Sequence, residues 1–420
     1  MEYYDRVTQE YLEAVQRHAI KPMFKIELMD YGENVFAEIT RVISKEDSGS
    51  LSINYQQGIR RSCSITISDI TGEYLPNVNG KIWINSKFKL YCGVQVQNIN
   101  TNNGQLTEET NTYWFSQGVF ILTNPTALRD LSKKSVTLNG VDKFGIFGSE
   151  TNFFQLEGTY VIPAESKVSK MIQDVLDLNM GNGYTLDSVM SNIDAVIGNS
   201  TTEYDLSKSA QSYFGEMLVE IGNMFAADVF YDTNGHFTLT KSNEKQQMDD
   251  MPTTWVFTDT DGHYFEPSLE SNFTEVFNTI KVVGTNSAAP ESEYTIPDPN
   301  NPEQITASWY QELVYGSPTR ASLIGRKVKY VESSFCYDIN RTKDFAKYLF
   351  RKNSILQQSL SFKCSFLPHL DVNTVIGIQD SYFGYDNDRF IIQSIEMPLS
   401  TDSLMELKVT NTANIPYFEF

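Results

Sequence analysis

Histidine is the most versatile residue for chemistry in this sequence, because imidazole acts as a base, an acid or a metal ligand near neutral pH. The four histidines are His18, His236, His263 and His369. None occurs in an HExxH sequence or beside a cysteine or serine signature, and the chain has no GxSxG, P-loop or GxGxxG. His236 follows an Asn-Gly pair, which predicts a hairpin turn. We therefore expect no catalytic residue and predict that the protein is not an enzyme.

Two short acidic sequences have the spacing of oxygen ligands. Asp259 and Asp261 alternate in the sequence Thr-Asp-Thr-Asp-Gly, like the start of a calcium loop, but His263 stands after the glycine and no third acidic ligand follows. Asp386-Asn387-Asp388 comes shortly after Gly384, which favours a hairpin turn. We predict turns and no metal at both places, with a cation held by Asp259 and Asp261 as the alternative.

The cysteines are expected to be structural. Cys63, Cys92, Cys336 and Cys364 form no CxxC and have no histidine at metal-ligand spacing. We expect small buried hydrophobic residues and no cofactor. Paired carboxylates for glycoside hydrolysis cannot be chosen among 53 acidic residues by sequence alone.

The charge of the chain excludes several kinds of partner. Lysine and arginine number 33 against 53 acidic residues, which gives a net charge of −20. Such a chain is poorly suited to hold nucleic acid by its phosphates or to bind an anionic membrane. It has no apolar run of about 18 residues and no signal-peptide pattern at its start. The acidic excess is concentrated in residues 150–205 and 244–303.

An amphipathic helix is predicted at the start of the chain. Tyr4, Val7 and Tyr11 are spaced by three and four residues, and the pattern ends at Pro22. Such a helix packs on its own barrel or on a neighbouring subunit, and the sequence leaves both open.

Residues 23–147 have the alternating pattern of strands. The sequence 62–68 is apolar at odd positions and hydroxylic at even ones, as in a half-buried antiparallel strand. The polar residues 97–111 predict a hairpin loop, and Gly118 inside a strand pattern predicts a bulge or sharp bend. The turn spacing is typical of a barrel or sandwich.

The rest of the chain combines helices and strands. Helices are predicted at 163–179, 207–225 and 340–355, and an Asn-Gly hairpin at 228–240. Residues 285–304 contain four prolines and predict a long exposed loop. Strands resume after Trp255 and end near Val409.

Several sequences in a fixed order carry a resemblance. They are Gly118–Leu122, Val136–Phe144, Met224–Leu239, Phe277–Asn286, Asp371–Ile376 and Asp388–Ile395. The series resembles the baseplate hub or tail-tip structural proteins of long-tailed bacteriophages, and the N-terminal half of the type VI secretion spike protein.

The resemblance implies a mainly β fold with α+β insertions. It places an N-terminal helix and a first tube-like β-barrel in residues 1–155, and a central helix–helix–hairpin unit in 156–250. A second tube-like barrel with one long helix follows in 251–420. No lysin domain is expected, because the chain ends at Phe420 soon after its last strand.

The resemblance also implies a function. Three copies would form a homotrimer whose six barrels make a ring at the tail tip or baseplate of a virion, assembled in the host bacterial cytoplasm. One face would meet the tail tube or distal tail protein, and the other a spike, fibre or tape-measure protein. DNA would pass through the lumen during genome ejection without specific binding. The acidic residues 150–205 and 244–303 either line that lumen and repel phosphates or face solvent, and the sequence leaves both open. No membrane contact is expected. The alternative is a carbohydrate-binding or carbohydrate-cleaving β-rich cell-surface protein.

Overall fold

The computed structural model is mainly β, as the sequence predicts. It describes residues 1–16, 21–30, 32–42, 48–83, 86–102, 105–130, 134–149, 155–179, 193, 197–202, 205–225, 227–241, 250–284, 291–294, 319, 321–333, 342, 345–346, 349–350, 353, 357–400 and 404–414. No helix within these residues is long and apolar enough to cross a membrane.

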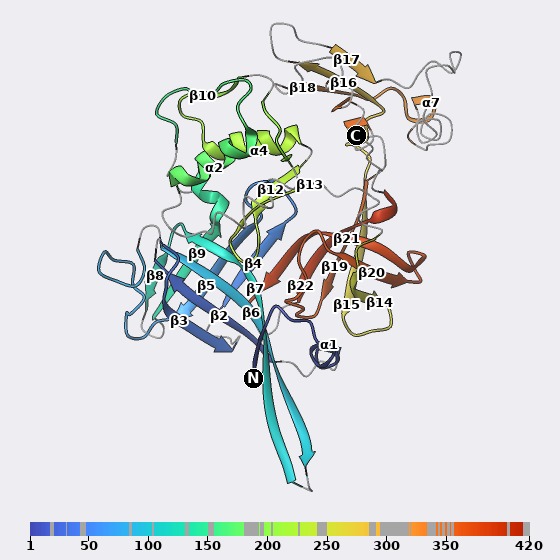
Figure 1. Ribbon diagram of the computed structural model, residues 1–420. Helices are drawn as coiled ribbons and strands as arrows, with labels where there is room; N and C mark the ends of the chain where they lie inside the picture. The colour runs from blue at the N-terminus through green and yellow to red at the C-terminus, as the bar shows by residue number, and fades with distance from the viewer. Residues whose placement is uncertain are drawn as a thin grey trace.

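Most strands belong to one 15-stranded sheet (Figure 1). Its first half contains β1 (Glu2–Tyr4), β2 (Lys21–Met29), β3 (Val35–Val42), β4 (Ser48–Asn54), β5 (Arg61–Ser68), β6 (Lys87–Asn102), β7 (Gln105–Leu122), β8 (Thr126–Arg129) and β9 (Lys134–Asp142). The hydrogen-bonded order is β4-β5-β9-β7-β6-β2-β3, with β1 parallel to β7 and β8 antiparallel to β9. In β5 the odd positions are buried and the hydroxylic ones lie toward the surface, as the alternation predicts.

The second half continues the same sheet. It contains β14 (Thr253–Thr258), β15 (Tyr264–Asn272), β19 (Gln357–Cys364), β20 (Val375–Asp380), β21 (Tyr385–Pro398) and β22 (Met405–Asn411). The order is β15-β19-β22-β21, and β20 lies between β21 and a parallel β14. β21 pairs with β4, where Ile395 faces Ile53, and one hydrophobic core includes residues from both halves. The two strand-rich halves are therefore joined by the backbone pairing of β21 with β4 and by a shared hydrophobic core.

A separate α+β unit packs on the first half (Figure 1). It consists of η1 (Lys143–Phe147), β10 (Tyr160–Ile162), α2 (Val168–Asn179), β11 (Leu206–Lys208), α4 (Phe214–Met224), β12 (Ala227–Tyr231) and β13 (Phe237–Lys241). Its own core includes Val175, Leu218 and Val229. The predicted hairpin is confirmed: β12 and β13 are antiparallel, and Gly235 in the turn has φ +79°.

The remaining elements are small. β16 (Thr279–Gly284) lies between β17 (Glu291–Tyr294) and β18 (Val328–Ser333) in a three-stranded sheet. A short helix, α7 (Ala321–Ile324), precedes β18, and η4 (Thr412–Asn414) follows β22.

The bend predicted at Gly118 is confirmed. Leu90 pairs with Gly118 and Tyr91 with Ser116, so Gln117 is an extra residue in β7. Gly118 has φ +137°, a conformation that favours glycine. A Cβ atom there would lie 3.1 Å from Cδ of Arg61, so the glycine also leaves room for that buried side chain.

Five predictions about local structure differ from the structure. Residues 97–102 and 105–111 belong to β6 and β7, which form a long two-stranded ribbon that extends from the sheet (Figure 1). A ribbon that extends from its sheet is held by backbone hydrogen bonds, which need no alternation of apolar and polar residues. Within the predicted exposed loop 285–304 the structure describes only 291–294, which form β17, and the rest lies outside the described residues.

The other three errors concern two helix starts and a turn. The first helix, α1, spans Gln9–Gln16, and residues 2–4 form β1 beside β7. Likewise α4 begins at Phe214, because residues 206–208 pair with β10 as β11. Residues 386–388 lie in β21, and the turn precedes them at 381–384. Most of the helix predicted at 340–355 lies outside the described residues.

Candidate functional site

The histidines that the structure describes lie in three different surroundings. His236 is at the surface after the β12–β13 turn, as predicted, with Nδ1 3.4 Å from a carboxylate oxygen of Asp232. His263 is buried and His369 is largely buried, and the rings of both contact Trp255, with centroids 5.8 and 5.7 Å from its ring. Burial lowers the pKa of His369 to about 4, so its imidazole is neutral at pH 7. His18 lies outside the described residues.

The carboxylates of Asp259 and Asp261 are used by the turn between β14 and β15. Asp261 accepts hydrogen bonds from the backbone N–H groups of His263 at 2.9 Å and Thr258 at 3.1 Å. Asp259 accepts from the N–H and hydroxyl groups of Ser381, at 3.0 and 2.6 Å. These hydrogen bonds lower the pKa of Asp259. The two carboxylates thus hold different backbone segments, which supports the turn interpretation.

The cysteines that the structure describes are buried and free. Burial raises the pKa of the thiols of Cys63, Cys92 and Cys364, so none is an activated nucleophile. Cys336 lies outside the described residues. Among the described residues no group of three histidine, cysteine or acidic side chains could hold a metal ion.

The main polar feature of the interior is instead a junction of buried charges, which we call the ionic junction: Glu33, Arg60, Arg61, Lys87, Asp142, Lys143, Asp228 and Asp371. It lies where β5, the end of β9 and the β12–β13 hairpin meet the loop before β20. Sequence reasoning did not single out these residues. The one local feature of the sequence that points to them is the pair of charged residues at 142–143, directly after the apolar strand sequence.

Asp142 organises the backbone at the centre of the ionic junction. Its carboxylate accepts the N–H groups of Arg60 at 2.7 Å, Arg61 at 3.0 Å and Phe144 at 3.0 Å, and it caps η1. Burial raises the pKa of Asp142 to about 6, although these three donors favour the charged form. One side chain therefore fixes the start of β5 against the start of η1.

Arg61 links three parts of the chain. Its guanidinium is 2% exposed and donates two hydrogen bonds to the carboxylate of Asp371, at 2.7 and 2.6 Å. A third reaches the carbonyl oxygen of Tyr231 in β12, at 3.3 Å. Because a bidentate arginine–carboxylate pair is directional, it fixes how the first half, the central unit and the second half meet.

Arg60, directly before β5, also attaches the central unit. Its guanidinium carbon lies 3.4 Å from the ring centre of Phe230 and 5.0 Å from that of Tyr55. A carboxylate oxygen of Asp228 lies 3.7 Å from Nη2 of Arg60, and the same carboxylate accepts a hydrogen bond from the hydroxyl of Tyr55 at 2.5 Å. The cation is thus held between aromatic faces and a carboxylate.

Lys143 and Lys87 share one carboxylate. Glu33 lies 2.6 Å from Nζ of Lys143 and 2.8 Å from Nζ of Lys87. Lys143 also donates to the carbonyl oxygen of Gly235 at 2.9 Å. Burial lowers the pKa of Lys143 to about 8, against the attraction of Glu33. This contact fixes the β2–β3 turn to the tip of the β12–β13 hairpin.

Helix α1 also bridges the halves. Tyr11 is fully buried, packs on Tyr113 and Phe115 of β7, and is hydrogen-bonded through its hydroxyl to Nδ1 of His369 at 2.8 Å. The helix therefore packs on its own chain, which was one of the two predicted targets. Tyr4 and Val7 are exposed. The polar groups of the interior thus fix orientation, and among the described residues the groups considered for catalysis do not converge.

Comparison with known proteins gives a consistent fold. No family model and no curated protein sequence matches the chain. The structure is similar to the tail protein from Neisseria meningitidis MC58, with a TM-score of 0.54 and 11% identity over 93% of this chain and 98% of that one. The 43 kDa tail protein of prophage MuSo2 from Shewanella oneidensis has a TM-score of 0.52 and 9% identity over 93% of this chain and 100% of that one. A chain of the Francisella PdpA–VgrG complex has a TM-score of 0.52 and 9% identity over 97% of this chain and 56% of that one. The fold is therefore one that occurs in phage tail proteins and in that complex.

Proposed function

We propose that this chain is a structural protein of a phage tail or phage-tail-like particle, acting as the baseplate hub or tail tip. The observation that carries the proposal is the shared fold, which covers nearly all of this chain and nearly all of two tail proteins. The likeness to a chain of the PdpA–VgrG complex is in keeping with the resemblance to secretion spike proteins that the sequence suggests.

The proposed role is to adapt the geometry of the tail. Three copies form a ring, and the two strand-rich halves of each copy supply six barrel-like segments around the axis. One face of the ring meets the tail tube or distal tail protein, and the other meets a spike, fibre or tape-measure protein. The ionic junction supports this role because it holds the two halves of each copy in one orientation.

The lumen of such a ring conducts DNA. The chain carries a net charge of −20, and a carboxylate-rich wall repels phosphates and lets the polymer slide. A non-enzymatic role accords with the buried neutral His369 and with the raised pKa of the three described thiols. The protein is then part of the virion and is assembled in the cytoplasm of the host.

Electron microscopy of intact particles labelled with an antibody to this chain tests the proposal. We expect label at the end of the tail far from the capsid, and label elsewhere or on no particle would overturn it. Sedimentation of the purified chain should give three times its 47.8 kDa. A monomer that is retained on a polysaccharide column would favour the carbohydrate-binding alternative instead.

A further inference from the structure

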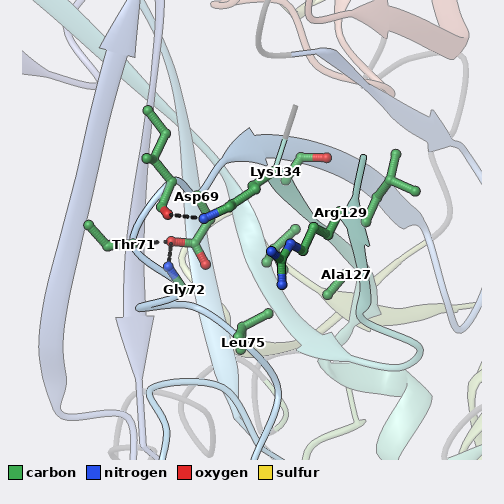
Figure 2. Close-up of a pocket in the computed structure, with 11 residues that line it drawn as sticks. Asp69, Thr71, Gly72, Leu75, Ala127, Arg129 and Lys134 are labelled. Carbon is green, nitrogen blue, oxygen red and sulfur yellow. Dashed lines mark hydrogen bonds between the residues drawn. The ribbon is translucent and has the colours of Figure 1, made fainter. Parts of the chain in front are cut away.

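A pocket lies at the edge of the first half, where the loop after β5 faces β8 over the start of β9 (Figure 2). Its volume is about 210 Å³. Its walls are mainly apolar, and the charged residues that line it are two cations and one carboxylate, Asp69. The lining includes Ile70, Leu75, Leu128, Val136, Arg129 and Lys134.

Three apolar residues of this pocket are unusually open to solvent. Ile70 is 75% exposed, Leu128 59% and Leu75 44%, although all three are large aliphatic side chains. A single exposed leucine needs no explanation, but three around one cavity form a patch. Such a patch is typical of a surface that another molecule covers.

The charge of the pocket is opposite to that of the chain. Figure 2 shows the guanidinium of Arg129 directed into the pocket, and within the described part of the chain it has no hydrogen-bond or ion-pair partner. Lys134 donates only to a carbonyl oxygen, that of Ile70, at 3.2 Å. At physiological salt, charges more than about 8 Å away are screened, so these two cations decide what binds despite the net charge of −20.

Among the described residues that line the pocket, the one carboxylate is already used. Asp69 accepts the backbone N–H groups of Gly72, Glu73 and Tyr74, each at 3.0 Å. These bonds hold the loop that forms one wall of the pocket. Asp69 is therefore a structural residue, and it leaves the side chain of Arg129 available to an external carboxylate.

Strand β8 adds a free backbone edge beside the pocket. It pairs with β9 from Thr126↔Thr137 to Arg129↔Lys134, and it has no second strand partner among the described residues. All four of its residues are exposed. A free edge of this kind accepts an extended segment by β-addition, in which the backbone gives affinity and adjacent pockets give specificity.

We infer that this edge binds an extended segment of a partner protein in which apolar and acidic residues alternate. The segment pairs with β8, an apolar side chain fills the pocket between Leu75 and Leu128, and a carboxylate meets Arg129. This inference does not depend on the proposed tail function, because it uses only the pocket, its charge and the free edge.

Binding of a fluorescein-labelled hexapeptide of alternating valine and glutamate to the full chain tests the inference by fluorescence polarisation. We expect saturable binding that Arg129→Glu and Leu128→Ser each weaken about fivefold or more, the scale of one exposed charge pair or apolar contact. Both residues are exposed, so the variants should fold normally. The matched control Lys170→Glu makes the same charge change on α2, away from the pocket, and should alter the dissociation constant less than twofold.

Two further probes separate the backbone and charge contributions. The same peptide methylated at its backbone nitrogens cannot pair with a strand and should not bind, and a valine–lysine peptide should bind far more weakly. Equal binding of the methylated peptide, or equal losses in Arg129→Glu and Lys170→Glu, would overturn the inference. Absence of peptide binding together with self-association that Arg129→Glu abolishes would also overturn it, in favour of a second copy as the occupant.

Discussion

Replacing Asp371 with asparagine tests whether the buried guanidinium of Arg61 fixes the two halves to each other. The substitution keeps the size of the side chain but removes the negative charge that receives two hydrogen bonds, at 2.7 and 2.6 Å. Arg61 would keep only neutral acceptors there: the carbonyl oxygen of Tyr231 at 3.3 Å and the amide oxygen of the new side chain. The variant therefore leaves a buried cation without its counter-ion.

The magnitude follows from the burial of the two partners. Breaking a fully buried ion pair by removing one partner costs about 3–5 kcal/mol, because the other charge remains uncompensated. The side chain of Asp371 is 33% exposed, so water already screens part of this interaction, whereas that of Arg61 is 2% exposed. We expect Asp371→Asn to lower the free energy of unfolding by about 2–3 kcal/mol.

Urea denaturation at pH 7, followed by tryptophan fluorescence, measures this loss. The matched control is Asp174→Asn, which breaks an exposed pair with Lys170 on α2 and should cost no more than about 0.5 kcal/mol. The double variant Arg61→Met/Asp371→Asn removes both charges and should be more stable than Asp371→Asn alone. Equal losses for Asp371→Asn and Asp174→Asn would refute the argument that this pair holds the halves together.

Two other variants test the interior. His369 has a pKa of about 4 in the folded state, below the unfolded value near 6.5, so protons favour the unfolded chain and stability falls as the pH drops from 6.5 to 4. His369→Gln should remove about 3 kcal/mol of this pH dependence in urea titrations, and an unchanged slope would contradict the assignment. A Cβ atom at Gly93 would lie 2.4 Å from the buried ring of Trp114, so Gly93→Ala should lower the free energy of unfolding by about 1–3 kcal/mol. The control is Gly158→Ala, because no atom lies within 4 Å of a Cβ atom at that position. Equal melting temperatures of the two variants would show that the Trp114 ring moves aside without cost.

The sequence predicted the strands well wherever one face of a strand is buried. In β5 the alternation of isoleucines with hydroxylic residues reflects a core face and a wet face, and a slip of one residue would exchange them. The signal failed in the β6–β7 ribbon, where polar residues predicted a loop. The backbone pairing of a ribbon requires no particular order of side chains, so its sequence does not mark it as a strand.

The ionic junction could not be predicted for a different reason. Arg61 and Asp371 are 310 positions apart in the chain, and a charged residue near a strand end normally lies in solvent. Only the fold brings them together, so no local pattern marks either one. The same holds for Tyr11 and His369, which are 358 positions apart.

The chemistry of the ionic junction bears on the role that we propose. An apolar contact between the two halves would stabilise them about as well as an ion pair, because burying charges has a large desolvation cost. It would also tolerate small rotations, since hydrophobic packing is not directional, whereas the bidentate pair of Arg61 and Asp371 accepts only a narrow range of angles. In a ring of three copies the same angular error recurs in each copy and prevents closure. A buried junction of charges is therefore better suited to a ring-forming tail protein than to a monomer, for which stability alone would favour an apolar contact.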